Sequence, residues 1–224
     1  MTSAVSAPSW DPIGLVVSFC RMIARAYDEL VPVPRWAVRF PLELPLPEGF
    51  VADQPETWPA VEGQLEFVEG KLFYMPPSAD RQQDTSADVI TTLGTWRKAH
   101  RDFVVAGNEA GMILEGETRG ADAAVWRRSD LAPHSGKYRR VPPVLAVEVE
   151  GELEDEPSLR IKAQWYLSRG VEVVWLLFPV ARRAIVLTRD AEHCVGDGGR
   201  IPAHPMLPGL APALEELFEQ IEGR

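Results

Sequence analysis

The fold is decided by the stretch from Val144 to Pro179, which reads VLAVEVEGELEDEPSLRIKAQWYLSRGVEVVWLLFP. Its beginning, VLAVEV, and its end, VEVVWLLFP, are short apolar runs of the length typical of buried strands. Between them, PSLRIKAQWYLSRG predicts a helix that Ser158 caps and Gly170 ends. A helix that joins two buried strands is the crossover that parallel strands require, so the stretch predicts an α/β domain.

One residue of this stretch is unusual for a buried strand. Glu148 lies inside the first apolar run, and because side chains alternate across a strand, it shares a face with Val144 and Ala146. An ionised carboxylate is costly to bury unless a cation or hydrogen-bond donors meet it. Glu150 follows at once and begins an acidic run, a pattern more typical of a solvated loop. Glu148 therefore requires a partner from elsewhere in the chain.

The flanking sequence adds further elements to the same domain. LEFVEGKLFYMPP alternates on both sides of Glu69-Gly70 and predicts a hairpin. The other predicted elements are a helix over 78–100, two or three short strands over 103–128, strands over 171–179 and 183–190, and a short amphipathic helix within 207–224. The expected architecture is a mixed sheet flanked by helices.

The first 60 residues are expected to form an extension, and residues 61–224 the main domain. IGLVVSFCRMIARAYDEL carries one amphipathic helical pattern. The following VPVPRWAVRFPLELPLPEGF is too rich in proline for regular structure. We therefore expect a helix and an extended arm that pack on the main domain.

Composition narrows the class of function. The chain has 224 residues, of which 46% are hydrophobic and 25% charged, as in ordinary globular proteins. A net charge of −10 argues against a protein that coats nucleic acid, but not against an enzyme that meets nucleic acid locally. Two cysteines without CxxC spacing, and no apolar run long enough to span a membrane, favour a cytoplasmic protein. The absence of GxSxG, phosphate-loop and dinucleotide motifs argues against a serine hydrolase and nucleotide cofactors.

Asp122, Glu148 and Lys162 together indicate a metal-dependent hydrolase. Asp122 lies in RGADAAVW, at the expected start of a strand, and Lys162 lies in the helix after the strand of Glu148. Carboxylates from adjacent strands can hold Mg²⁺ or Mn²⁺, which activates water. A lysine can orient or deprotonate that water, or offset negative charge. Taken singly, Asp122 is also typical of a turn and Lys162 of a solvated helix surface. Glu148 is the least ordinary of the three.

Five segments of the chain resemble, in order and spacing, the Uma-two family of endonucleases with the PD-(D/E)XK restriction-endonuclease-like fold. The segments are LEFVEGKLFYMPPS, RGADAAVW, VPPVLAVEVEGE, LRIKAQWYLSRGVEVVWLLFP and LPGLAPALEELF, which together span residues 64–218. The resemblance implies a restriction-endonuclease-like domain that hydrolyses phosphodiester bonds in DNA with Mg²⁺ or Mn²⁺ as cofactor.

The resemblance also implies roles for single residues. Asp122 and Glu148 would hold the metal, and Lys162 would be the catalytic lysine, displaced from the strand onto the helix. Glu66 and Tyr166 would assist the site. Glu150 would be an additional metal ligand, a residue that supports the ligands, or only the start of the acidic loop. Glu150 occupies the position at which restriction enzymes of this fold carry their lysine, so only Lys162 could supply the cation.

Several departures from the family pattern keep a second function open. Ala121 replaces the usual proline, Gly151 replaces a serine, and the histidine that commonly follows Pro-Pro-Ser is missing. The alternative is a catalytically inactive nuclease-fold protein that acts as a binding or regulatory module. For an active enzyme we expect DNA as the partner, with phosphate contacts from the basic loop of Lys137, Arg139 and Arg140, and no membrane. A homodimer through an edge strand after Pro179 is a further open alternative.

Overall fold

The structure is a computed structural model, described here for residues 38–135 and 137–221. The helix predicted from IGLVVSFCRMIARAYDEL lies outside the described residues. Contacts divide the chain after Arg39, and Phe40–Arg224 form one compact unit. No helix of the described ranges is long and apolar enough to cross a membrane.

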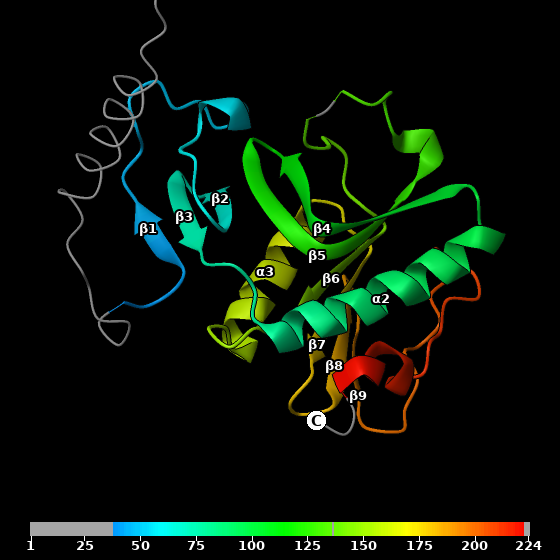
Figure 1. Cartoon of the computed structure of the whole chain (residues 1–224). Coiled ribbons are helices and arrows are strands. Elements are labelled where there is room, and N and C mark those ends of the chain that lie inside the picture. Colours follow the sequence, from blue (N-terminus) through cyan, green and yellow to red (C-terminus); the bar gives the residue numbers. More distant parts are fainter. Residues whose placement is uncertain (1–37, 136, 222–224) are drawn as a thin grey trace, which may run out of the picture. The chain divides into compact units, whose positions relative to one another are not determined.

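The described part of this unit is built on one mixed sheet of nine strands, with two α-helices (Figure 1). The strands are β1 (Leu42–Leu44), β2 (Gln64–Val68), β3 (Lys71–Met75), β4 (Phe103–Leu114), β5 (Glu117–Arg127), β6 (Leu145–Val149), β7 (Val173–Phe178), β8 (Arg183–Thr188) and β9 (Glu192–Val195). The α-helices are α2 (Asp80–Ala99) and α3 (Glu156–Ser168), and short 3-10 helices are η2 (Pro55–Thr57), η3 (Arg128–Asp130), η4 (Glu215–Leu217) and η5 (Glu219–Ile221). The strand order is β1-β3-β2-β5-β6-β7-β8-β9, and β4 pairs with β5 outside this path.

The predicted strand–helix–strand unit is present. β6 and β7 pair in parallel through α3, whereas the other strand pairs of the described sheet are antiparallel. Leu145, Val147 and Val149 face one core, which they share with α2, and Ala146 faces the other, which it shares with α3. Glu148 follows this alternation and therefore lies on the α3 face.

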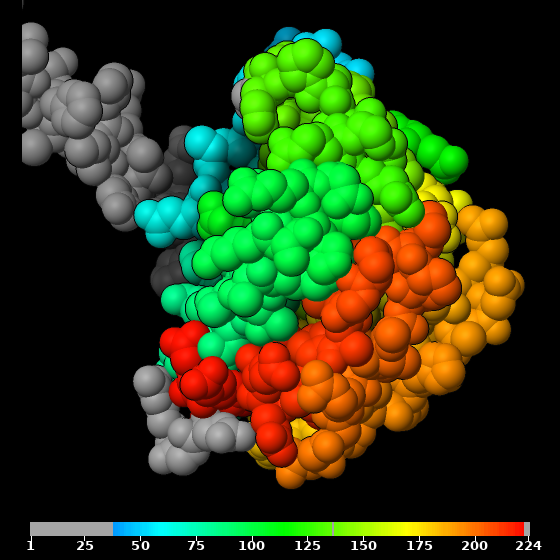
Figure 2. All heavy atoms as spheres, turned by 90° about the vertical axis from the view of Figure 1, so that its right-hand side faces the viewer, coloured from blue at the N-terminus to red at the C-terminus, as the bar shows by residue number. Residues whose placement is uncertain are grey.

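The C-terminal segment closes the core on the α2 side. Figure 2 shows this segment, in orange and red, lying against α2, in green. The prediction of an amphipathic helix near the C-terminus is wrong, because the segment forms the short 3-10 helices η4 and η5. Pro208, Gly209 and Pro212 precede them and disfavour a longer helix. Leu217 and Phe218 are nevertheless fully buried in the core.

Other elements differ from the prediction in extent. The proline-rich stretch within residues 1–60 contains a strand, because β1 pairs with β3. The predicted short strands over 103–128 are the two long strands β4 and β5, so Asp122 lies in the middle of a strand and not at its start. The hairpin of β2 and β3 turns as predicted at Glu69 (φ 52) and Gly70 (φ 76), a backbone shape suited to two-residue hairpins.

The cap of α3 is also different. Asp155, and not Ser158, is the N-cap residue, since its carboxylate accepts the backbone N–H of Ser158 at 2.9 Å. Ser158 completes a reciprocal capping box, in which its hydroxyl meets the backbone N–H of Asp155 at 3.0 Å. Gly170 ends the helix region with φ 90, a conformation that glycine adopts without strain.

Candidate active site

Asp122, Glu148 and Lys162 lie around one small hollow between β5, β6 and α3. The hollow has a volume of about 30 Å³. Further residues that line it are Gln64, Met75, Pro76, Ser78, Gln82, Glu109, Gly120 and Glu154. We call it the carboxylate hollow. The register that pairs Ala123 of β5 with Val147 of β6 places Asp122 beside Glu148.

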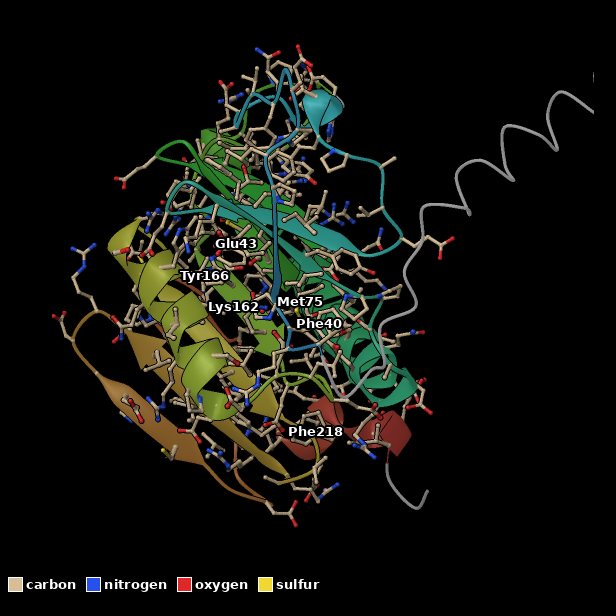
Figure 3. The ribbon with its side chains drawn as sticks, turned by 90° about the vertical axis from the view of Figure 1, so that its left-hand side faces the viewer. Phe40, Glu43, Met75, Lys162, Tyr166 and Phe218 are labelled. Carbon is tan, nitrogen blue, oxygen red and sulfur yellow. The ribbon has the colours of Figure 1, made fainter. Side chains whose placement is uncertain are left out.

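Glu148 is held at both carboxylate oxygens by residues of α3. The Lys162 ammonium donates to Oε2 at 3.0 Å, and the Tyr166 hydroxyl donates to Oε1 at 2.7 Å. Lys162 and Tyr166 are four residues apart, so they share one face of α3 (Figure 3). Only 2% of Glu148 is exposed. A cation and a hydroxyl donor therefore explain how this carboxylate is accommodated inside an apolar strand.

Lys162 is bound by two carboxylates. Besides Glu148, it donates to Glu154 Oε1 at 2.8 Å, and its own side chain is 14% exposed. Burial lowers the pKa of Lys162, but the negative charges of Glu148 and Glu154 outweigh it and hold that pKa well above its usual range. Lys162 is therefore a cation in this arrangement. It can orient a water or offset developing charge, but it does not accept a proton.

Asp122 is fixed by the backbone of β6. Its Oδ2 accepts the backbone N–H of Val149 at 2.7 Å, and its Oδ1 accepts the Gln82 side-chain amide at 3.3 Å. Burial, and then the negative charges of Glu148 and Glu109, raise the pKa of Asp122 well above its usual range. The carboxylates of this hollow therefore repel one another.

A bulge in β4 brings a third carboxylate to the site. Gly107 pairs with Ala123 and Ala110 with Ala121, so Asn108 and Glu109 together lie opposite the single residue Asp122. Asn108 (φ 56) and Glu109 (φ 57) adopt the left-handed conformation. The Glu109 side chain retains exposed surface, yet burial of its carboxyl and the charge of Glu148 raise its pKa to about 7.

Sequence reasoning missed two acidic residues of the site. Glu109 interrupts an alternating run at Gly-Asn-Glu, and this polar break is the signal by which a bulge is recognised. Glu154 belongs to the acidic run that begins at Glu150, whose composition is typical of a solvated loop. Its side chain is nevertheless only 9% exposed. The loop therefore contributes one largely buried carboxylate that accepts a hydrogen bond from Lys162.

Two of the predicted auxiliary residues lie outside the carboxylate hollow. Glu66 is 6% exposed and forms an ion pair with Arg119 of β5. Glu150 follows β6, and its backbone N–H donates to Leu177. The Glu150 carboxyl has Arg183 as its cationic neighbour, and burial raises its pKa. Neither residue lines the hollow, whereas Tyr166 reaches it through Glu148.

The basic loop is engaged within the chain. Lys137 forms an ion pair with Glu56 at 2.7 Å. Arg140 contacts Asp53 at 3.5 Å. The Arg139 guanidinium lies over the ring of Trp126, 4.1 Å from its centroid. The role in phosphate binding that the sequence suggests for Lys137, Arg139 and Arg140 stays a prediction.

The donor set of the hollow suits a hard divalent cation. Among residues 38–135 and 137–221, no three His, Cys, Asp or Glu residues are grouped closely enough to hold a metal ion as they stand. Carboxylate oxygen is nevertheless the ligand that Mg²⁺ prefers, and Glu109, Asp122 and Glu148 supply it from three adjacent strands. A bound cation would neutralise the negative charge through which these carboxylates repel one another.

Comparisons with known proteins place this chain in a family. A crystal structure titled as that of "a putative nuclease belonging to DUF820 from Anabaena variabilis ATCC 29413" is similar, with a TM-score of 0.68 and 15% identity. The similarity covers 77% of this chain and 99% of that one, and at this identity it establishes the nuclease-like fold alone. No curated protein matches the sequence significantly. The model of the Uma2 family, described as "Putative restriction endonuclease", matches residues 52–215, and the chain therefore belongs to the Uma2 family.

Proposed function

We propose that this protein is a metal-dependent endonuclease that hydrolyses phosphodiester bonds in DNA. The observation that carries the proposal is the convergence of Asp122 and Glu148 with the cation Lys162 in one buried hollow. The fold and the family support the same reaction class. Cytoplasmic location belongs to the same proposal.

Each residue of the site has a separate task in this proposal. Asp122 and Glu148, with Glu109, would hold Mg²⁺ or Mn²⁺. The bound metal would activate water and neutralise charge on the scissile phosphate. The Lys162 ammonium offsets negative charge that develops on the phosphate oxygens. The Tyr166 hydroxyl and the Val149 backbone N–H hold the carboxylates of Glu148 and Asp122 in place.

Plasmid cleavage tests the proposal. Supercoiled DNA is incubated with wild type, Asp122→Asn and Lys162→Ala in Mg²⁺ or Mn²⁺, and without metal. We expect cleavage by wild type with metal, and a loss of at least about 100-fold in each variant, the size typical of removing one transition-state contact. Lys71→Ala is the matched control, because Lys71 forms an ion pair at the surface of β3. Equal cleavage by all four proteins would overturn the assignment.

A second candidate is a catalytically inactive nuclease-fold protein that acts as a binding or regulatory module. The observation that favours it is that both oxygens of Glu148 and Oδ2 of Asp122 already accept hydrogen bonds from the chain. Calorimetry with Mn²⁺ separates the candidates. A catalytic site binds Mn²⁺ and loses that binding in Asp122→Asn, whereas an inactive module shows no binding at millimolar Mn²⁺.

A further inference from the structure

A larger hollow adjoins the carboxylate hollow, between α3 and the strands β1 and β3. Its volume is about 530 Å³, and its apolar walls include Phe40, Phe73, Met75 and Ile161. We call it the apolar hollow. Figure 3 shows Phe40 and Met75 beside Lys162, on the side of the molecule where α3 faces the first strands. Ile161 is 67% exposed, which is high for an isoleucine and leaves an apolar rim open to solvent.

The apolar hollow is also lined by a buried ion pair in which two polar atoms lack hydrogen-bond partners in the described part of the chain. Glu66 and Arg119 both line it and are 6% and 8% exposed. They form an ion pair with each other, but Glu66 Oε1 and Arg119 Nε have no hydrogen-bond partner within the described residues. Buried polar atoms without partners are costly, so each of them requires an explanation such as strain, a functional role, or a bound water or ion. The hollow thus combines apolar walls with a buried ion pair in which one acceptor atom and one donor atom are left without a partner among residues 38–135 and 137–221.

The charge of the rim excludes a phosphate from this hollow. Glu69, Glu152 and Asp155 join Glu66 and Glu154 in lining it, against the two cations Arg119 and Lys162. Both cations are already paired with carboxylates. The net negative charge of the rim repels a phosphate group, whereas it does not repel a neutral flat group with a polar edge. Of the parts of a nucleic acid, only the base has this character.

The two hollows lie side by side. Met75, Glu154 and Lys162 line both of them. A strand whose scissile phosphate lies at the carboxylate hollow therefore has the base of a neighbouring nucleotide at the mouth of the apolar hollow. In an intact duplex the faces of that base are covered by stacking, so the base must be unpaired to enter.

We propose that the apolar hollow binds one unstacked base of the DNA, so that the substrate is single-stranded or carries an unpaired nucleotide. This inference rests on the proposed endonuclease function and names the substrate class of the same site. Phe73 and Phe40 supply aromatic surface for the face of the base, and the polar side chains of Glu66 and Arg119 line the same hollow, where its edge would lie. Fully paired DNA lacks an exposed base face and binds more weakly.

The test is a fluorescence titration with 2-aminopurine as the probe base. The full chain is titrated, in Ca²⁺ to slow cleavage, into a duplex with one unpaired 2-aminopurine and into the same duplex with that base paired. We expect a saturable emission change only with the unpaired base. Ile161→Glu replaces apolar surface of the rim with negative charge at an exposed position and should weaken binding of the unpaired probe about tenfold. Val180→Glu is the matched control, because Val180 is 70% exposed and lies outside the hollow.

The outcomes separate this inference from the proposed function. Equal affinity for paired and unpaired probes, or equal effects of Ile161→Glu and Val180→Glu, would overturn the base site. Plasmid cleavage could still be present in that case, and the proposed function would stand. An emission change specific to the unpaired base without any cleavage would support the base site and refute the nuclease proposal.

Discussion

Tyr166 shows how a single hydroxyl positions the site. It is fully buried against Trp165, and its hydroxyl donates to Glu148 Oε1 at 2.7 Å. Burial raises the pKa of Tyr166 well above its usual range, and the charge of Glu148 adds to this effect. The hydroxyl therefore remains a donor and fixes one oxygen of Glu148.

Tyr166→Phe should lower the free energy of unfolding by about 1–3 kcal/mol, because a buried carboxylate loses one of its donors. Urea denaturation measures the change. Tyr74→Phe is the control, since the Tyr74 hydroxyl donates to the carbonyl of Glu62 at the surface. Equal losses in the two variants would contradict a special role for the Tyr166 hydroxyl.

Lys162 has a structural consequence that can be measured without DNA. Lys162→Ala leaves Glu148 and Glu154 without their shared cation, and breaking a buried pair in this way costs about 3–5 kcal/mol of unfolding free energy. Thermal and urea unfolding should both register the loss. The surface ion pair of Lys71 with Glu43 provides the comparison, and Lys71→Ala should change stability little.

At the scale of secondary-structure elements, the central elements could be predicted and the edges could not. β6 and β7 are nearly continuous apolar runs because both of their faces are buried, and the helix α3 lies between them with clear start and stop signals. β1 and β9 are short edge strands with mostly exposed side chains, so they leave no such pattern. The 3-10 helices at the C-terminus are fixed by burial of Leu217 and Phe218, a tertiary effect that local propensity does not contain.

The same contrast holds for the residues of the site. Glu148 could be predicted because a charged residue inside an apolar run can be recognised from the sequence alone. For Glu109 the sequence offers only the polar break at Gly-Asn-Glu, which indicates a bulge, and its place beside Asp122 depends on the register of β4 against β5. Glu154 could not be predicted, since an acidic loop residue that turns inward has the same local sequence as one that turns outward.

The capping box of α3 predicts a coupled effect. Asp155→Ala and Ser158→Ala should each lower the unfolding free energy by about 1 kcal/mol, because each removes bonds from the first turn. The double variant should lose less than the sum, since both residues belong to one reciprocal pair. A double-mutant cycle by urea denaturation gives the coupling, and strict additivity would contradict it.

At the scale of the whole sheet unit, metal binding should appear as stability. A ligand that binds only the folded state stabilises it by about 2.7 kcal/mol at 100 times its dissociation constant. We expect Mn²⁺ to raise the melting temperature of wild type and EDTA to reverse the rise. Asp122→Asn should lose the effect, whereas Asp130→Asn, at an exposed position in η3, should keep it. A rise of equal size in Asp122→Asn would place the metal elsewhere.

The bulge of β4 has a consequence for how such proteins can diverge. Its two residues Asn108 and Glu109 occupy the space of one, so β4 carries a single residue more than a regular ladder opposite β5 requires. Deleting that residue would restore the regular ladder, leave the rest of the sheet in register and withdraw a carboxylate from Asp122. A chain of this fold can therefore gain or lose an acidic group at its site through a change in length, without any substitution at the carboxylates of β5 and β6.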